Sequence, residues 1–237
     1  MNKELLLVGS IPLPTAEKVI TTFGPPLGNY LHAMPDGEIG ARRWWVLRLS
    51  FQVFNNHPDI EVLTRPARDS GVERNIPRDR SDMWTFKVRE GVEKVRFGDL
   101  GTRLGFACDA INSYFVFKTL RDQGLLPPEV RFQVSIPLVN SVIRKSTFTV
   151  EGDLERIRPG YEEALKAEMQ NIISNIPNQD LAIQFDCSHE ITDVNGGIPG
   201  EAIEGSIERN IGQIQRLSSI RSEEHTSELQ SPMYLVC

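Results

Sequence analysis

Short apolar runs alternate with helical patterns four times along this chain, and that alternation restricts the fold more than any other property of the sequence. The strand-like runs cover 5–9, 30–34, 130–136 and 181–185. Helical spacing of apolar residues covers 15–22, 41–54, 106–120, 154–176 and 203–217. Strands that alternate with helices indicate a parallel sheet covered by helices. We therefore expect an α/β fold in which 1–220 belong to one domain, with an irregular insert at about 59–100.

Local signals set the expected limits of several elements. Thr15 is expected to cap the first helix, and Pro25-Pro26 should prevent that helix from extending much beyond Thr22. The segments 84–88 and 92–97 are expected to form the two arms of a hairpin within the insert. Trp45 lies on the helical pattern of 41–54, so we expect it to belong to the core.

Composition narrows the class of protein. The net charge of −6 argues against a nucleic-acid binder or a protein of anionic membrane surfaces, since both need a basic surface. The three cysteines are scattered and lack C-x-x-C spacing, which indicates a reducing compartment and no disulfide framework. The apolar run near the start is too short for a signal sequence or a membrane span. These features predict a cytoplasmic protein that binds neither nucleic acid nor membranes.

The C-terminal segment 221–237 differs in character from the rest of the chain. It follows the last predicted helix without a turn or cap signal, and 221–231 resemble one reading frame of a common sequencing-library adapter. We interpret 221–237 as a non-native tail. The alternative is an ordinary polar C-terminal tail.

Polar side chains follow each predicted strand. In parallel α/β folds the loops at the C-terminal ends of the strands converge, so chemistry gathers there. Carboxylates at such a position can hold an ammonium group, or act as general acid or base if burial raises a pKa. Ser135 also ends a strand. The candidate substrate-binding residues are Ser10, Asp36, Glu38, Asp186 and Glu190.

Each candidate also has a purely structural interpretation. Asp36 lies in Pro-Asp-Gly, which is typical of a turn, and Ser10 could cap the turn that follows it. Cys187 and His189 are only two possible metal ligands, whereas a zinc site needs three or four, so we assign no metal ligand in this chain. The sequence contains no P-loop, no G-x-G-x-x-G after a strand and no G-x-S-x-G elbow.

Three motifs carry a resemblance to a known family. V-G-S-I-P at 8–12, P-D-G-E-I-G-A-R at 35–42 and Q-F-D at 184–186 occur in this order at predicted strand ends. They resemble the I-G-S-F-P, H-G-E-x-x-R and I-D-E-P segments of cobalamin-independent methionine synthase. The match is closest to small, mostly uncharacterised relatives of that enzyme, within the superfamily of barrels that also contains uroporphyrinogen decarboxylase. The resemblance spans about 4–220.

The resemblance implies a (β/α)₈ TIM barrel, of which this chain would contain about the first four strand–helix units. It implies a zinc-dependent methyltransferase that transfers a methyl group from a folate to a homocysteine-like thiol. Ser10, Glu38 and Asp186 would hold the amino-acid part of the substrate: two carboxylates for the ammonium group, and a hydroxyl with a backbone N–H for the carboxylate. The zinc ligands would follow in a later H-x-C strand, so this chain is expected to be an inactive fragment without zinc.

Two departures from the family pattern leave the substrate open. Asp36 replaces the histidine before Gly-Glu, and Cys187-Ser188 replace Glu-Pro after the fourth-strand aspartate. One alternative is a barrel enzyme of the lyase or decarboxylase type that uses the same carboxylates without a metal. A second alternative is a non-catalytic truncated product.

Overall fold

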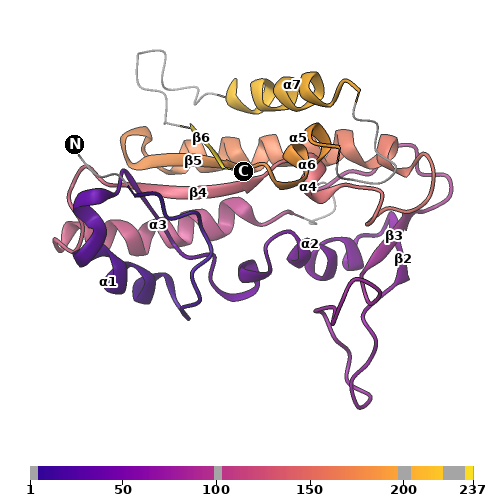
Figure 1. Ribbon diagram of the computed structural model, residues 1–237, viewed down its shortest axis with the longest axis horizontal. Coiled ribbons are helices and arrows are strands. Elements are labelled where there is room, and N and C mark those ends of the chain that lie inside the picture. Colours follow the sequence, from indigo (N-terminus) through magenta and orange to yellow (C-terminus); the bar gives the residue numbers. More distant parts are fainter. Residues whose placement is uncertain (1–4, 99–102, 197–203, 221–232, 237) are drawn as a thin grey trace.

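The computed structural model describes residues 5–98, 103–196, 204–220 and 233–236 (Figure 1). Its main sheet has four parallel strands in the order β1-β4-β5-β6. Their bounds are β1 Ala33–Pro35, β4 Arg131–Pro137, β5 Leu181–Asp186 and β6 Met233–Val236. Leu5 adds a parallel bridge to Leu31, just before β1. Neighbours in the sheet therefore follow chain order, and within the described residues the sheet stays open rather than closing into a barrel.

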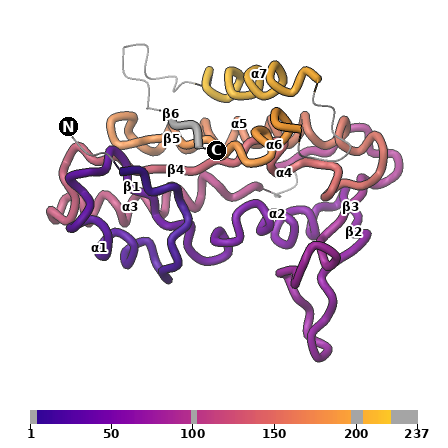
Figure 2. Tube along the Cα trace, viewed as in Figure 1, coloured from indigo at the N-terminus to yellow at the C-terminus, as the bar shows by residue number. Residues whose placement is uncertain are grey.

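Four longer helices pack along this sheet: α1 Ala16–Leu27, α3 Phe106–Asp122, α5 Asp153–Asn175 and α7 Ser206–Ser218. α1 contacts α3, and α3 contacts α5 (Figures 1 and 2). Arg216 of α7 pairs with Glu162 of α5 at 2.6 Å. The helices, like the strands, are therefore arranged as neighbours in chain order.

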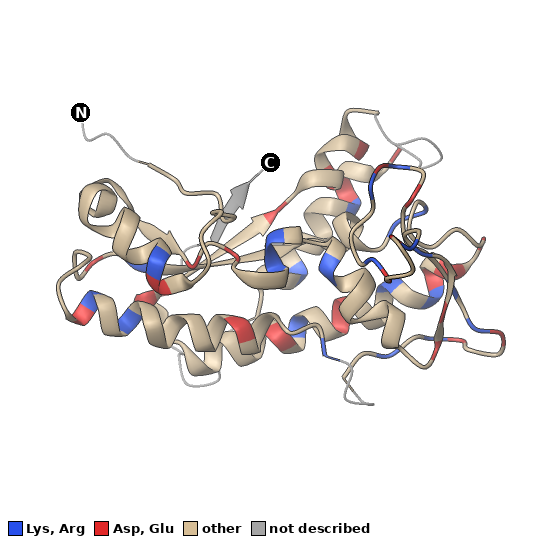
Figure 3. Ribbon diagram, turned by 90° about the horizontal axis from the view of Figure 1, so that it is seen from below, with Lys and Arg blue, Asp and Glu red and all other residues tan. Residues whose placement is uncertain are grey.

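Shorter elements connect these units. They are η1 Gly28–Tyr30, η2 Gly40–Trp44, α2 Leu47–Gln52, η3 Phe54–Asn56, α4 Val139–Val142, η4 Asn178–Asp180 and α6 Ser188–Val194. A separate antiparallel pair, β2 Ile60–Thr64 and β3 Thr85–Val88, lies in the insert. The loop that joins β2 to β3 projects from the body and carries charges of both signs (Figures 1 and 3), such as the pair Arg65–Glu73 at 2.8 Å.

The two faces of β4 differ in chemistry. Phe132 packs against Phe117 of α3 with ring centroids 5.4 Å apart. Gln133, next along the strand, is also buried, but its Nε2 donates to the carbonyl of Leu7 at 2.8 Å and to Oε1 of Gln184 at 2.9 Å. Because successive side chains of a strand point to opposite faces, the helix-covered face is apolar and the other face is polar. The candidate site lies at the end of this polar face.

The expected α/β class, the helices over 106–120 and 154–176, and the strands over 130–136 and 181–185 are confirmed. The last helix begins at Ser206 rather than near 203. The expected strand at 5–9 is wrong, because only Leu5 makes a bridge there and Leu6 and Val8 are 48% and 57% exposed. The predicted tail 221–237 lies outside the described residues, apart from the four that form β6.

Two predicted helix limits are also wrong. Thr15 does cap α1, accepting a hydrogen bond from the N–H of Lys18, but α1 continues through Pro25-Pro26 to Leu27. The two prolines fall in its final turn, where Gly28 N–H still donates to the carbonyl of Gly24. The expected helix over 41–54 is interrupted at Trp45, which adopts φ +48° and separates η2 from α2.

The hairpin forms from different partners than expected. β3 pairs with β2, not with the segment 92–97. That segment lies on α5 instead, where Val95 N–H donates to the carbonyl of Arg156 at 3.0 Å. Pro159 in α5 has no N–H to offer, and Gly160 has no side chain to block the approach of Val95. No described helix is both long and apolar enough to cross a membrane.

Candidate functional site

Polar side chains meet at the C-terminal ends of β1, β4 and β5. Asp36 follows β1 directly, Ser135 lies in β4 and Asp186 is the last residue of β5. Ser10 comes from the segment whose start bridges to the chain before β1. The sequence predicts this convergence correctly, because parallel neighbouring strands end at the same edge of a sheet.

Ser10 and Glu38 are direct partners. The Ser10 hydroxyl donates a hydrogen bond to Oε2 of Glu38. A Cβ placed on Gly9 would lie 3.0 Å from Oε1 of Glu38 and 3.3 Å from Oγ of Ser135. Any larger residue at position 9 would therefore crowd both groups, which gives the glycine of the V-G-S motif a physical reason.

Asp186 is held by two donors from different parts of the chain. Gln184 Nε2 donates to Oδ1 at 2.8 Å, and Trp45 Nε1 donates to Oδ2 at 3.2 Å. Gln184 also donates to Ser135 Oγ at 3.2 Å, so the polar groups of β4 and β5 form one connected network. Burial raises the pKa of Asp186 above its ordinary value, although both hydrogen bonds oppose this.

Glu38 has the most perturbed carboxyl group of the site. Burial raises its pKa from 4.5 to about 7, the Ser10 hydrogen bond opposes this, and the nearby charges of Asp186 and Asp36 raise it further. Glu38 also adopts φ +50°, a left-handed conformation that is uncommon for residues other than glycine. Strain of this kind concentrates at functional sites, where the surrounding structure enforces it.

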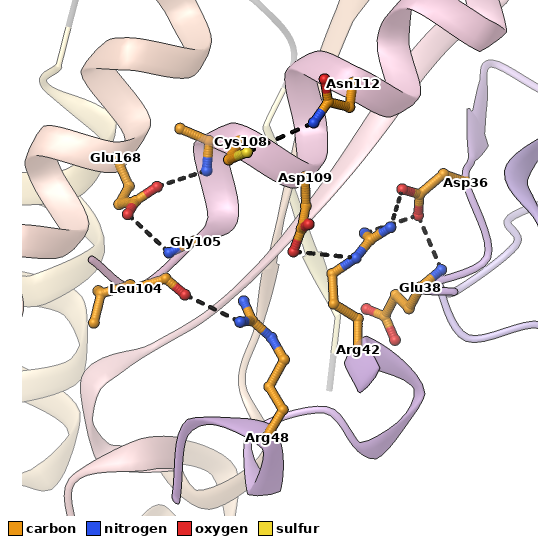
Figure 4. A network of polar contacts seen from close by, with 11 residues as sticks. Asp36, Glu38, Arg42, Arg48, Leu104, Gly105, Cys108, Asp109, Asn112 and Glu168 are labelled. Carbon is orange, nitrogen blue, oxygen red and sulfur yellow. Dashed lines mark hydrogen bonds and ion pairs between the residues drawn. The ribbon is translucent and has the colours of Figure 1, made fainter. Parts of the chain in front are cut away.

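Asp36 serves as an anchor for its neighbours. It accepts from the two terminal nitrogens of Arg42 at 3.1 and 2.6 Å and from the N–H of Glu38 at 2.9 Å (Figure 4). Arg42 in turn lies 3.4 Å from Asp109 of α3. Both oxygens of Asp36 are engaged within the protein, where they position Arg42 and the backbone of Glu38, and Asp36 also lines the cavity beside the network.

Glu190 belongs to a different group of contacts. It is buried, and its carboxylate accepts from the N–H and the hydroxyl of Ser141 at 3.0 and 2.6 Å. Its backbone carbonyl accepts from the side chain of Asn210 at 3.1 Å. These contacts join α4, α6 and α7 and leave Glu190 out of the network around Glu38 and Asp186.

The described residues do not fit a zinc ion. Cys187 is buried with Sγ 3.8 Å from the carbonyl of Phe185, and the ring of His189 contacts the guanidinium of Arg144, a cation. Across the part of the chain that the structure describes, no three His, Cys, Asp or Glu side chains are grouped so as to hold a metal. The zinc site implied by the resemblance would therefore need ligands beyond these residues.

A cavity of about 40 Å³ opens beside this network. Among the residues that line it are Glu38, Arg42, Trp45, Arg48 and Ser135. Sequence reasoning placed Trp45 in the core and did not select Arg42 or Arg48. Arg42 ends the P-D-G-E-I-G-A-R motif, which is a local signal for it. Nothing local marks Trp45 or Arg48, because their roles depend on a break in the expected helix and on contacts with distant segments.

Comparison with protein families, with curated proteins and with solved structures found no match for this chain. The relationship to the methionine synthase family thus stays a prediction from three short motifs.

Proposed function

We propose that the cluster of Ser10, Glu38 and Asp186 binds the ammonium group of an amino-acid-like substrate. The observation that carries this proposal is the presence of two partly buried carboxyl groups, Glu38 and Asp186, near the same strand ends. Burial raises the pKa of both groups, and the charge of Asp186 raises that of Glu38 further. The nearby charge of Arg42 lowers the pKa of Glu38, but both terminal nitrogens of Arg42 donate to Asp36. Within the described part of the chain, neither Glu38 nor Asp186 therefore has a cation in direct contact. A ligand ammonium supplies the missing positive charge.

The geometry gives an ammonium group suitable acceptors. Ser10 occupies Oε2 of Glu38, and the opposite oxygen, Oε1, lies beside Gly9 and Ser135. Asp186 is fixed in orientation by Gln184 and Trp45. An ammonium has three donors and no acceptor, and charge-assisted hydrogen bonds to carboxylates are about twice as strong as neutral ones. Trp45, Gln184 and the hydroxyl of Ser10 orient these carboxylates before the ligand arrives.

The reaction we propose is methyl transfer to a homocysteine-like thiol, with the amino-acid end of the substrate held by this cluster. The sequential order of the strands β1, β4 and β5 and of the helices α1, α3 and α5 supports a barrel of the methionine synthase and uroporphyrinogen decarboxylase type, since each unit in such a barrel adds beside the previous one. A folate methyl donor and a zinc ion stay predictions from the sequence motifs. Binding of an ammonium group by Glu38 and Asp186 requires neither of them.

One observation favours the alternative of a metal-independent lyase or decarboxylase. A carboxyl group with a pKa of about 7 can serve as general acid or base near neutral pH, and Glu38 has such a pKa. Zinc analysis of the intact protein, purified without added metal, separates the two reactions. A thiol methyltransferase of this type retains zinc, whereas the lyase needs none.

Calorimetric titration with L-homocysteine tests the ammonium site. We expect binding that is weakened at least about tenfold in Glu38→Gln and in Asp186→Asn, since each change removes a charge-assisted hydrogen bond of roughly 1.5–3 kcal/mol. Glu17→Gln, on the exposed start of α1, is the matched control and should bind as the wild type does. 4-Mercaptobutanoate, which lacks the amine, should bind wild type and both site variants alike. Equal affinity for the two thiols in the wild type would exclude an ammonium site.

A further inference from the structure

Arg48 of α2 is a buried cation with an unmet hydrogen-bonding group. Only 4% of its surface is exposed, and its guanidinium lies 4.7 Å from the ring centre of Phe106. Nη1 donates to the carbonyl of Leu104 at 3.0 Å, whereas Nη2 is buried without a partner among the described residues. In Figure 4 the guanidinium points toward the start of α3 and the Arg42–Asp109 pair.

The surroundings of Arg48 do not neutralise it by direct contact. Asp109 is paired with Arg42, and Glu168 accepts from the N–H groups of Gly105 and Ala107 at the start of α3. That helix start adds further positive potential near the guanidinium. A buried charge without an opposite charge in direct contact is strongly unfavourable, so Arg48 indicates a missing counter-ion.

Arg48 lines the cavity of about 40 Å³ beside the network, together with a hydrogen-bond acceptor that has no partner among the described residues. Gln133 lines it together with Arg48, and the buried Oε1 of Gln133 has no partner within the described residues. The volume of about 40 Å³ holds a few water-sized groups, since one water needs roughly 10–15 Å³. A carboxylate has three heavy atoms and fits that space. One ligand with an N–H group and a carboxylate would satisfy both orphan atoms.

We infer that Arg48 recognises the carboxylate of the ligand whose ammonium group binds Glu38 and Asp186, so that the site selects amino acids over simple amines. This inference rests on the proposed function for the ammonium half alone. Ser10, which the motif comparison assigns to the carboxylate, donates its hydroxyl hydrogen to Glu38. Among the described residues that line the cavity, Arg48 has the buried donor without a partner.

The test uses three probes and three forms of the full chain. The probes are L-methionine, its decarboxylated amine 3-(methylsulfanyl)propan-1-amine, and the amine-free acid 4-(methylsulfanyl)butanoate. The forms are wild type, Arg48→Met and, as a matched control, Arg43→Met, an exposed arginine of η2 that lies outside the cavity. Binding is measured by calorimetry, and thermal melting establishes that each form is folded.

We expect the wild type to bind methionine at least about tenfold more tightly than the decarboxylated amine, which corresponds to ~1.4 kcal/mol. Arg48→Met should lower methionine affinity to that of the amine and leave the amine affinity unchanged, while Arg43→Met changes neither. Equal wild-type affinity for methionine and the amine would overturn the inference even if Arg48→Met fails to fold. If the ammonium site is absent, the amine does not bind to any form. The butanoate should still bind the wild type and should not bind Arg48→Met. Equal binding of the butanoate to these two forms would overturn the role of Arg48.

Discussion

Replacement of Glu38 by Gln should make the protein more stable at neutral and alkaline pH. The burial of Glu38 raises its pKa from 4.5 to about 7 in the folded state. A carboxyl group whose pKa is raised on folding stabilises the fold fully below pH 4.5, and this contribution is lost as pH rises through about 7. Above that window the folded protein must hold an unfavourable charge. Gln has almost the same shape, still accepts from Ser10 and never becomes charged.

The size of the effect follows from the same values. The pKa of Glu38 rises from 4.5 to about 7, and each pKa unit corresponds to about 1.36 kcal/mol. The rise therefore corresponds to ~3 kcal/mol in the free energy of unfolding. Glu38→Gln and wild type should therefore be about equally stable at pH 4. Between pH 4.5 and 7.5 the variant should become increasingly more stable than the wild type. Above that range the difference in their free energies of unfolding should stay constant at ~3 kcal/mol.

Urea unfolding of the two proteins at closely spaced pH values measures this difference. Glu17→Gln, an exposed carboxyl removed at the start of α1, controls for the loss of a negative charge as such. A stability difference that does not change with pH, or that favours the wild type at pH 8, would refute the reasoning. It would mean that Glu38 is either solvated or paired with a cation in the folded protein.

Three further substitutions test individual contacts, the first two by thermal or urea unfolding. Gly160→Ala should lower the free energy of unfolding by ~3 kcal/mol or more, because the new Cβ would lie 1.8 Å from the carbonyl oxygen of Val95. Gly212→Ala in α7 is the control and should be neutral or stabilising. A mild effect at Gly160 would contradict the close approach. Glu168→Gln should cost ~1–3 kcal/mol by removing one of two acceptors at the start of α3, and unchanged stability would show that the cap is dispensable. Glu190→Gln should leave amino-acid affinity in calorimetry unchanged, since its contacts lie apart from the network, and a loss of affinity would return Glu190 to the site.

The sequence predicts the parts of this fold that short-range patterns control. α3 and α5 are long and strongly periodic, and β4 and β5 are apolar runs bounded by turn signals, so each appears near its expected position. The rule that chemistry gathers at the ends of parallel strands brought Ser10, Glu38 and Asp186 together before their contacts were known. Asp36 lies where it was expected but has the structural role of an anchor.

The errors arise where distant contacts outweigh local preference. The break at Trp45 interrupts a good helical pattern, and the indole then reaches Asp186 in another strand. The segment 92–97 alternates like a strand, yet the missing side chain of Gly160 lets it approach α5, where the carbonyl of Arg156 accepts from Val95 N–H. Arg48 was missed because a lone arginine in a helical pattern carries no local mark of burial.

Proton release on ligand binding tests the central claim most directly. If an ammonium binds beside Glu38, it favours the charged carboxylate, so a proton must leave. With a pKa of about 7, the free carboxyl is half protonated at pH 7, and binding of L-homocysteine should release about 0.5 proton. Calorimetry in buffers of different ionisation enthalpy measures this number. At pH 7, where the ligand amine is already protonated, this release should vanish in Glu38→Gln, whereas proton uptake by the wild type, or release that persists in Glu38→Gln, would contradict an ammonium site at Glu38 and Asp186.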